Sequence, residues 1–165
     1  MDVGRVMRHF VCGPWTLGRV LPAPVLRAIE TAIARSEQSH GGEIRFAVET
    51  ALDTRSLLRG TSARQRAIDV FSELRVWDTE HNNGVLIYLL LADHHVEIVA
   101  DRGISQNVGS ADWERVCRQI EDHLKQGRFE RGLTAGIEAV GTLLARYYPR
   151  GNADKNELTD RPEVI

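Results

Sequence analysis

The chain is poor in the features that mark specialised classes of protein. Its 165 residues include only two cysteines, too few for a disulfide framework, and this favours a reducing compartment. No apolar run approaches the roughly 20 residues that span a bilayer, so no membrane-spanning segment is expected. The N-terminus carries scattered arginines and lacks the clean apolar centre of a secretory signal. We therefore predict a cytoplasmic protein.

A large excess of charge of one sign is also missing. Lys and Arg total 21 against 23 Asp and Glu, which gives a formal net charge of −2. The chain as a whole therefore lacks the basic excess that draws proteins to nucleic acid or to anionic membranes. We expect no nucleic-acid partner, and a protein partner of unknown identity is left open. The length suits one globular domain with a substantial core.

Common catalytic and cofactor motifs are absent as well. The sequence contains no P-loop, no GxGxxG, no CxxC and no HExxH pattern, and no Ser/His/Asp triad spacing. No organic cofactor is indicated by these patterns. Function has to be sought in the way the fold gathers individual polar residues.

Hydrophobic periodicity predicts three strands. Glu43 to Thr50 alternates apolar and polar residues, which is typical of a half-buried strand. Gly84 to Ala92 is apolar on both faces and is predicted to be a central strand. After a turn at Asp93–His95, Val96 to Asp101 returns as an antiparallel partner.

Apolar stripes at helical spacing predict the remaining elements. Four helices are expected over about 22–40, 61–74, 110–126 and 130–146. The order α-β-α-β-β-α-α predicts an α/β fold, a three-layer-like sandwich with a small mixed sheet covered by helices. We expect residues 1–20 to be irregular, with Met7 as an alternative start. Residues 21–149 are expected to form the single domain and residues 150–165 a disordered tail.

The loops at one rim of this sheet are rich in oxygen donors and guanidinium groups. A hairpin of the second and third strands places the 82–84 loop beside residues 101–103. The first strand begins at the same rim, because it runs parallel to the second. The rim therefore contains His40, Glu43, Asp78, Glu80, Asn82, Asn83, Asp101 and Arg102. Hard oxygen ligands suit Ca²⁺ or Mg²⁺, and the predicted ligands are Glu43, Asp78, Glu80, Asn82 and Asp101.

Purely structural roles are the alternative for this rim, since acidic and amide residues also cap turns and pair with arginine. A second candidate site is the opposite rim, where ligands of open α/β sheets usually bind. It carries Glu49, Asp53, Asp93, His94 and His95. The three residues 93–95 are equally typical of a polar hairpin turn, and adjacent histidines tend to point in different directions.

Three features together resemble the TPM domain family, formerly called DUF477. The apolar strand opens with Asn83-Gly84-Val85-Leu86, and the return strand ends in a glycine turn at Gly103. The link between the last two helices contains a phenylalanine followed after two residues by glycine, Phe129-Glu130-Arg131-Gly132. The resemblance covers roughly residues 25–148. It implies an α/β sandwich, and it implies either divalent-cation binding in an accessory role or acid phosphatase activity.

Two functions follow from these expectations. We favour an interaction or accessory module that binds Ca²⁺ or a partner's basic group at the first rim, because no nucleophile and base are paired there. The alternative is a metal-dependent phosphomonoester hydrolase with Asp78, Asp101 and Arg102 as its catalytic residues. In that alternative the carboxylates hold the metal, Arg102 orients phosphate and metal-bound water attacks. The family's usual Gly-aromatic-Gly turn is replaced here by Asp101-Arg102-Gly103.

Overall fold

A four-stranded mixed sheet forms the middle of the molecule, with the strand order β3-β2-β1-β4. Its strands are β1 (Glu43–Glu49), β2 (Gly84–Leu90), β3 (His95–Ala100) and the short β4 (Glu163–Val164). β1 runs parallel to both β2 and β4, whereas β2 and β3 are antiparallel. The parallel and antiparallel pairings predicted for the three main strands are confirmed.

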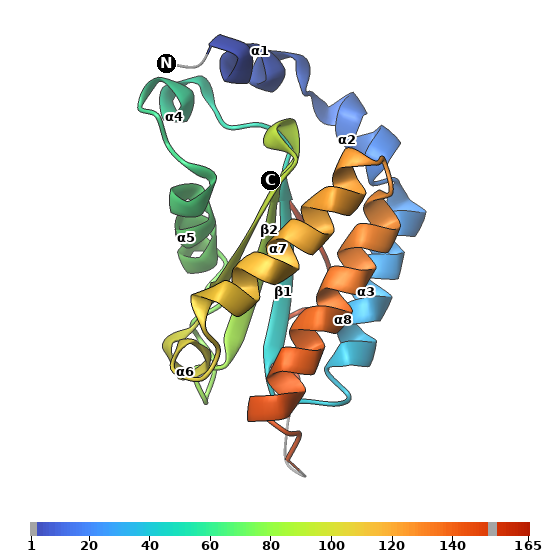
Figure 1. Ribbon diagram of the computed structural model, residues 1–165, viewed down its shortest axis with the longest axis vertical. Helices are drawn as coiled ribbons and strands as arrows, with labels where there is room; N and C mark the ends of the chain where they lie inside the picture. The colour runs from blue at the N-terminus through green and yellow to red at the C-terminus, as the bar shows by residue number, and fades with distance from the viewer. Residues whose placement is uncertain (1–2, 152–154) are drawn as a thin grey trace.

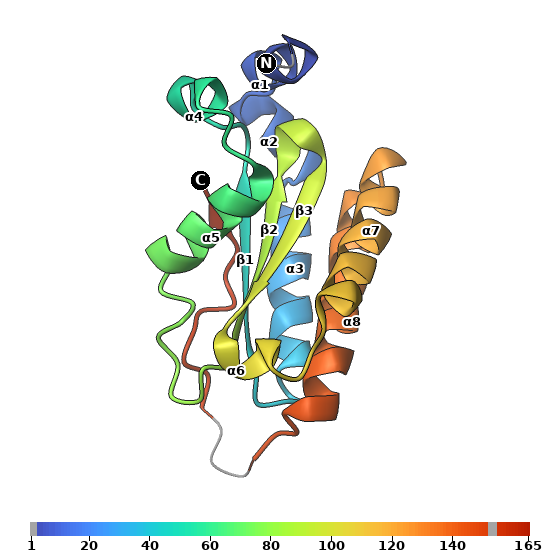
Figure 2. The same ribbon diagram turned by 60° about the vertical axis from the view of Figure 1, so that its left-hand side comes forward.

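Helices cover both faces of this sheet in the computed structural model, which describes residues 3–151 and 155–165. One face packs against α3 (Ala23–Ser36), α7 (Ser110–Lys125) and α8 (Phe129–Tyr147), as Figure 1 shows. The other face packs against α5 (Ala63–Glu73), which lies on the opposite side of the sheet from those three helices in Figure 2. Within the described ranges, no helix is long and apolar enough to cross a membrane.

Two hydrophobic cores lie on either side of the sheet, because successive strand residues point to opposite faces. Phe46 and Ile87 point into the core under α3, α7 and α8. Ala47, Leu86 and Tyr88 point into the smaller core under α5. Every residue of β2 is buried, as expected for a strand predicted to be central. The predicted α/β sandwich is therefore confirmed.

Three short helical turns lie in segments expected to be loops or a tight turn. Asp53 caps α4 (Thr54–Leu58), and Asp101 caps α6 (Arg102–Ser105). The β2–β3 connection is a 3-10 turn, η1 (Leu91–Asp93), followed by His94 with a φ of 47°. Side-chain caps of this kind form locally without an apolar stripe, so periodicity does not reveal them.

The N-terminal segment, expected to be irregular over residues 1–20, forms α1 (Val3–Val11) and α2 (Pro14–Val20). Residues 1 and 2 lie outside the described part of the chain. α1 is fastened by Arg5, whose Nε lies 2.9 Å from a carboxylate oxygen of Asp93. These residues are 88 positions apart. The sequence around residue 5 therefore does not reveal the contact that orders the helix.

The C-terminal segment also differs from the expectation of a disordered tail over 150–165. Residues 155–165 run back along β1, and β4 pairs with its outer edge (Figure 2). Residues 152–154 lie outside the described part of the chain. The buried guanidinium of Arg45 donates to the carbonyl oxygens of Thr159 at 2.6 Å and Arg161 at 2.8 Å. It also lies 3.2 Å from the Glu163 carboxylate. A buried cation requires such partners, and the segment supplies them.

Truncation of the chain after Leu158 is predicted to lower the free energy of unfolding by about 3 kcal/mol, because it leaves Arg45 buried without its partners. Arg45→Met in the truncated chain should recover part of this loss, since it removes the stranded charge. Urea denaturation of the four chains (full-length and truncated, with and without Arg45→Met) measures the coupling. Equal effects of Arg45→Met in both lengths would contradict this role for the segment.

Candidate functional site

Two close backbone approaches shape the rim at the beginning of β1 and β2. A Cβ added to Gly84 would lie 2.0 Å from the carbonyl oxygen of Val76, and one added to Gly103 would lie 2.5 Å from that of Asn82. Both positions therefore require glycine. The Asn-Gly start of β2 and the glycine turn after β3 have the same cause, since each lets a loop pack directly on its neighbour.

Gly84→Ala is predicted to destabilise the chain by about 3 kcal/mol or more, because the added methyl group meets a backbone carbonyl that has no freedom to move aside. Gly18→Ala in α2 is the matched control. No atom lies within 4 Å of its added Cβ, so this change should be neutral or slightly stabilising. Thermal unfolding of both variants checks the contrast, and similar melting temperatures would contradict it.

Asn83 and Asp101 lie side by side at this rim, as the hairpin geometry predicts. The Asp101 N–H donates to the Gly84 carbonyl at 2.9 Å, and the Asn83 side-chain amide donates to the carbonyl of Gly41. Asp101 Oδ1 accepts the N–H of Arg102 at 2.6 Å. Asn83 Oδ1 and Asp101 Oδ2 are buried and have no hydrogen-bond partner among the described residues. These two oxygens are available to a bound donor or cation.

The other rim residues have separate surroundings. Asp78 and Glu80 are exposed, and the Glu80 N–H donates to the Glu157 carboxylate at 3.1 Å. Asn82 Oδ1 accepts a hydrogen bond of 3.3 Å from Arg102 Nε. Within residues 3–151 and 155–165, no three His, Cys, Asp or Glu side chains are arranged so that they could hold a metal ion. Among the described residues, the five predicted as ligands are therefore not assembled around one metal site.

Glu43 turns away from these loops toward the C-terminal segment. Its Oε2 accepts the backbone N–H groups of Glu157 at 3.2 Å and Leu158 at 3.0 Å. There it joins Glu37 and Asp160 around a cavity of about 120 Å³, which His40, Arg150 and Lys155 also line. We call this cavity the carboxylate pocket. Sequence reasoning missed Glu37 and Asp160, because the segment that carries Asp160 was expected to be disordered.

The carboxylate pocket changes the protonation of its acids. Burial, together with the nearby charges of Glu43 and Asp160, raises the pKa of Glu37 to about 8, although the Ile44 N–H donates to it at 2.8 Å. Burial likewise raises the pKa of Glu43, and Glu157 and Asp160 add to the effect. Glu37 also ends α3, where the partial negative charge of the helix terminus disfavours a carboxylate. The pocket therefore holds a proton at neutral pH that a cation could replace.

Glu37→Gln is predicted to stabilise the chain increasingly as the pH rises. The folded chain binds the Glu37 proton more tightly than the unfolded chain, so stability falls as the pH rises from the ordinary pKa of 4.5 to about 8. Glutamine removes this loss and still accepts the Ile44 N–H. We expect a gain of about 1–3 kcal/mol near pH 8 and little change near pH 5, by urea denaturation. A gain that does not depend on pH would contradict the raised pKa.

The acidic residues at the opposite rim are engaged in structural contacts. Glu49 Oε2 accepts hydrogen bonds from Arg66 Nε at 2.8 Å and from the Tyr88 hydroxyl at 2.7 Å. Asp53 Oδ1 accepts the backbone N–H groups of residues 55 and 56 at the start of α4. Asp93 lies against Arg5 and, at 3.2 Å, His9 Nε2, and its contacts with these two side chains lower its pKa despite its partial burial.

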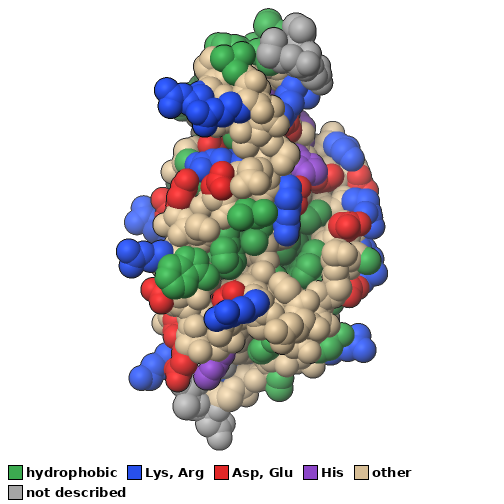
Figure 3. Space-filling view, turned by 90° about the vertical axis from the view of Figure 1, so that its left-hand side faces the viewer, with side chains coloured by type: hydrophobic (Ala, Val, Ile, Leu, Met, Phe, Trp, Pro, Cys, Tyr) green, Lys and Arg blue, Asp and Glu red, His purple; other side chains and the backbone are tan. Residues whose placement is uncertain are grey.

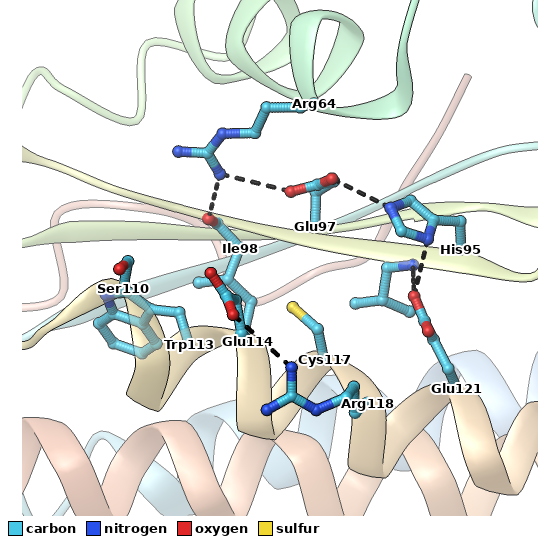
Figure 4. Close-up of a pocket in the computed structure, with 11 residues that line it drawn as sticks. Arg64, His95, Glu97, Ile98, Ser110, Trp113, Glu114, Cys117, Arg118 and Glu121 are labelled. Atoms are coloured by element: carbon cyan, nitrogen blue, oxygen red, sulfur yellow. Dashed lines mark hydrogen bonds and ion pairs between the residues drawn. The ribbon is translucent and has the colours of Figure 1, made fainter.

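The two histidines of this rim diverge. His94 packs edge-on against the Phe129 ring at 5.8 Å. His95 lies in a groove of about 490 Å³ beside β3, between carboxylates of Glu97 at 3.0 Å and Glu121 at 2.8 Å (Figure 4). The hydrogen bond that Glu97 accepts from His95 raises the pKa of His95, and the charge of Glu121 contributes. The histidine pair is therefore not oriented toward a shared ligand.

Side chains in and near the groove protect β3, which forms the open edge of the sheet. Glu121 accepts the N–H of Val96 at 3.0 Å, and Arg64 donates to the carbonyl of Ile98 at 2.6 Å (Figure 4). Ser105 Oγ donates to the carbonyl of Ala100 at 3.0 Å. Side chains thus occupy backbone groups that would otherwise pair with another strand. Burial raises the pKa of the Cys117 thiol in this groove to about 12, which disfavours the thiolate at neutral pH.

Comparison with known proteins agrees with the class that the fold defines, a small mixed sheet between two helical layers. The model of the TPM domain matches residues 18–143, and the chain belongs to this family. The solved NMR structure of the BA42 protein from the psychrophilic bacterium Bizionia argentinensis is similar, with 34% sequence identity and a TM-score of 0.77. The alignment covers 87% of this chain and 94% of BA42. The curated proteins contain no match.

Proposed function

We propose that the chain is a non-enzymatic accessory module that takes up a cation in the carboxylate pocket. The observation that carries the proposal is that Glu37, Glu43 and Asp160 line one small cavity, where burial raises the pKa of Glu37. Carboxylates that share a small pocket repel one another, and a positive charge relieves that repulsion. The cavity of about 120 Å³ suits an ammonium group or a metal ion rather than an organic substrate.

Two kinds of cation have the required chemistry. Ca²⁺ or Mg²⁺ is the cation predicted from the sequence, and its oxygen ligands would come from Glu43 together with Glu37 and Asp160. A lysine side chain of a partner protein is the other source, and it needs fewer ligands in fixed positions. The absence of a preassembled three-ligand set in the described ranges favours the lysine, because an ammonium group accepts looser geometry.

Titration calorimetry near pH 7 should separate the two sources, with CaCl₂, MgCl₂ and a lysine-rich peptide as ligands. Binding should release the Glu37 proton, so the measured heat should depend on the ionisation enthalpy of the buffer. Asp160→Asn should weaken binding about tenfold, since it removes one charge from the pocket. The affinity should also rise as the pH approaches 8, where Glu37 ionises unaided.

Asp122→Asn is the matched control for Asp160→Asn, because Asp122 is exposed on α7 and pairs with Lys125 outside the pocket. It should bind with unchanged affinity. Binding of the metal ions alone would identify a metal site, and binding of the peptide alone would identify a partner's lysine. If no ligand binds, or if both variants weaken binding equally, the pocket has no such role.

A phosphomonoester hydrolase is the second proposal. Arg102 supports it, since its guanidinium is exposed at the rim and donates to Asn82 through Nε, which leaves its terminal nitrogens for a phosphate. Buried Asp101 lies next to it, and Asp78 lies in the preceding loop. Turnover of a generic phosphomonoester that is lost in both Arg102→Gln and Asp101→Ala would establish the hydrolase. Absence of turnover in the wild-type chain would leave the accessory role.

A further inference from the structure

The helix α1 is amphipathic, but its polar face packs against the protein and its apolar face is exposed. In a helix on the surface of a soluble domain, the apolar face normally packs inward. Here the inward face carries Arg5 and His9, and His9 is 4% exposed. The outward face carries Met7, Phe10 and Val11, which are 58%, 66% and 63% exposed. An apolar helix face is thus directed away from the protein.

Specific contacts fix this orientation. His9 Nδ1 accepts the backbone N–H of Leu52 at 2.9 Å, and its Nε2 lies 3.2 Å from Asp93. Arg5 donates to Asp93 at 2.9 Å and to the carbonyl of Thr61 at 3.2 Å. Rotation of α1 to bury its apolar face would break these interactions. The exposure of Phe10 therefore follows from the way the helix is anchored.

The apolar face continues onto α2 and lies beside positive charge. Trp15 is 65% exposed, and with Met7, Val11 and Leu91 it lines a groove of about 500 Å³. Residues 3–20 contain three arginines and no Asp or Glu. Figure 3 shows hydrophobic side chains at this end of the molecule with Lys or Arg side chains just below them. We call the exposed surface of α1 and α2 the N-terminal tip.

We propose that the N-terminal tip binds the surface of an anionic lipid bilayer. The tip lies at one end of the longest axis of the molecule, with the short helix α4 beside it (Figure 1), so α1 is close to a flat surface that meets this end. Trp and Phe are suited to the boundary between headgroups and acyl chains. Arg19 is exposed and can meet lipid phosphates, and Arg8, whose side chain is 55% exposed, also lies 3.5 Å from a carboxylate oxygen of Asp93.

Dimerisation through the N-terminal tip explains the exposed apolar face less well than lipid binding does. A two-fold contact places a patch against itself, so it would bring the arginines of both copies together. Such like-charge contacts weaken association. The lipid surface supplies the opposite charge instead. This site is separate from the carboxylate pocket, which lies where β1 begins, at the other end of the sheet.

Co-sedimentation with vesicles tests the proposal on the full chain. Wild-type protein should bind vesicles of phosphatidylcholine with roughly one third phosphatidylglycerol, and should bind much less to phosphatidylcholine alone. Phe10→Ser and Trp15→Ser should each lower the partition coefficient about tenfold. Trp77→Ser is the matched control, because Trp77 is 50% exposed near the opposite end of the sheet. Its binding should match that of the wild type.

Two further experiments separate the contribution of arginine charge to binding from the insertion of apolar side chains into the bilayer. Arg19→Gln should lower binding about fivefold, and the exposed Arg75→Gln should not change it. In a Trp77→Phe background, addition of anionic vesicles should shift the emission of Trp15 to shorter wavelength, while Trp113 is already buried.

Three results would overturn the proposal: no binding of wild-type chain to anionic vesicles, equal loss in the Trp15 and Trp77 variants, or a wild-type dimer that Phe10→Ser converts to monomer. The last result would assign the face to a second copy. All the substitutions lie at exposed positions, and circular dichroism verifies that each variant is folded.

Discussion

The burial of Arg45 is the constraint on which the proposed site depends. A guanidinium on a buried strand cannot remain without partners, because the desolvated charge would cost several kcal/mol. The carbonyl oxygens of Thr159 and Arg161 meet this need and hold the C-terminal segment along β1. Asp160 lies between those two residues in sequence, so the same contact carries its carboxylate to Glu37. One buried cation thus completes a pocket of buried and half-buried carboxyl groups.

The N-terminal segment is held by the same physical principle with the charges reversed. Asp93, in the turn after β2, contacts Arg5 and His9 of α1. In both cases a buried or half-buried charge on the central sheet, or in the turn that follows it, fastens a terminal segment through polar contacts rather than through apolar packing. For α1 the consequence is an outward apolar surface, since the inward face is committed to polar contacts.

The sequence predicts those parts of the fold that depend on periodicity. The three main strands and four long helices follow from apolar spacing, and the proximity of Asn83 to Asp101 follows from hairpin geometry. The terminal segments could not be predicted in this way, because a few polar contacts between residues far apart in sequence order them. The contact of Glu43 with the C-terminal segment could not be predicted from the sequence for the same reason. The β-branched residues after Pro162 are the one local signal that favoured a strand near the C-terminus.

A net charge of −2 conceals a strong separation of charge along the chain. Residues 3–20 carry three basic and no acidic side chains, so the remainder has five more acidic than basic groups. Composition therefore argues against attraction to an anionic surface, whereas the distribution of charge allows it at the N-terminal tip. A chain bound by its N-terminal tip would be oriented by repulsion of its acidic remainder. The carboxylate pocket, near the other end of the sheet, would then face away from the lipid and stay accessible to a cationic partner.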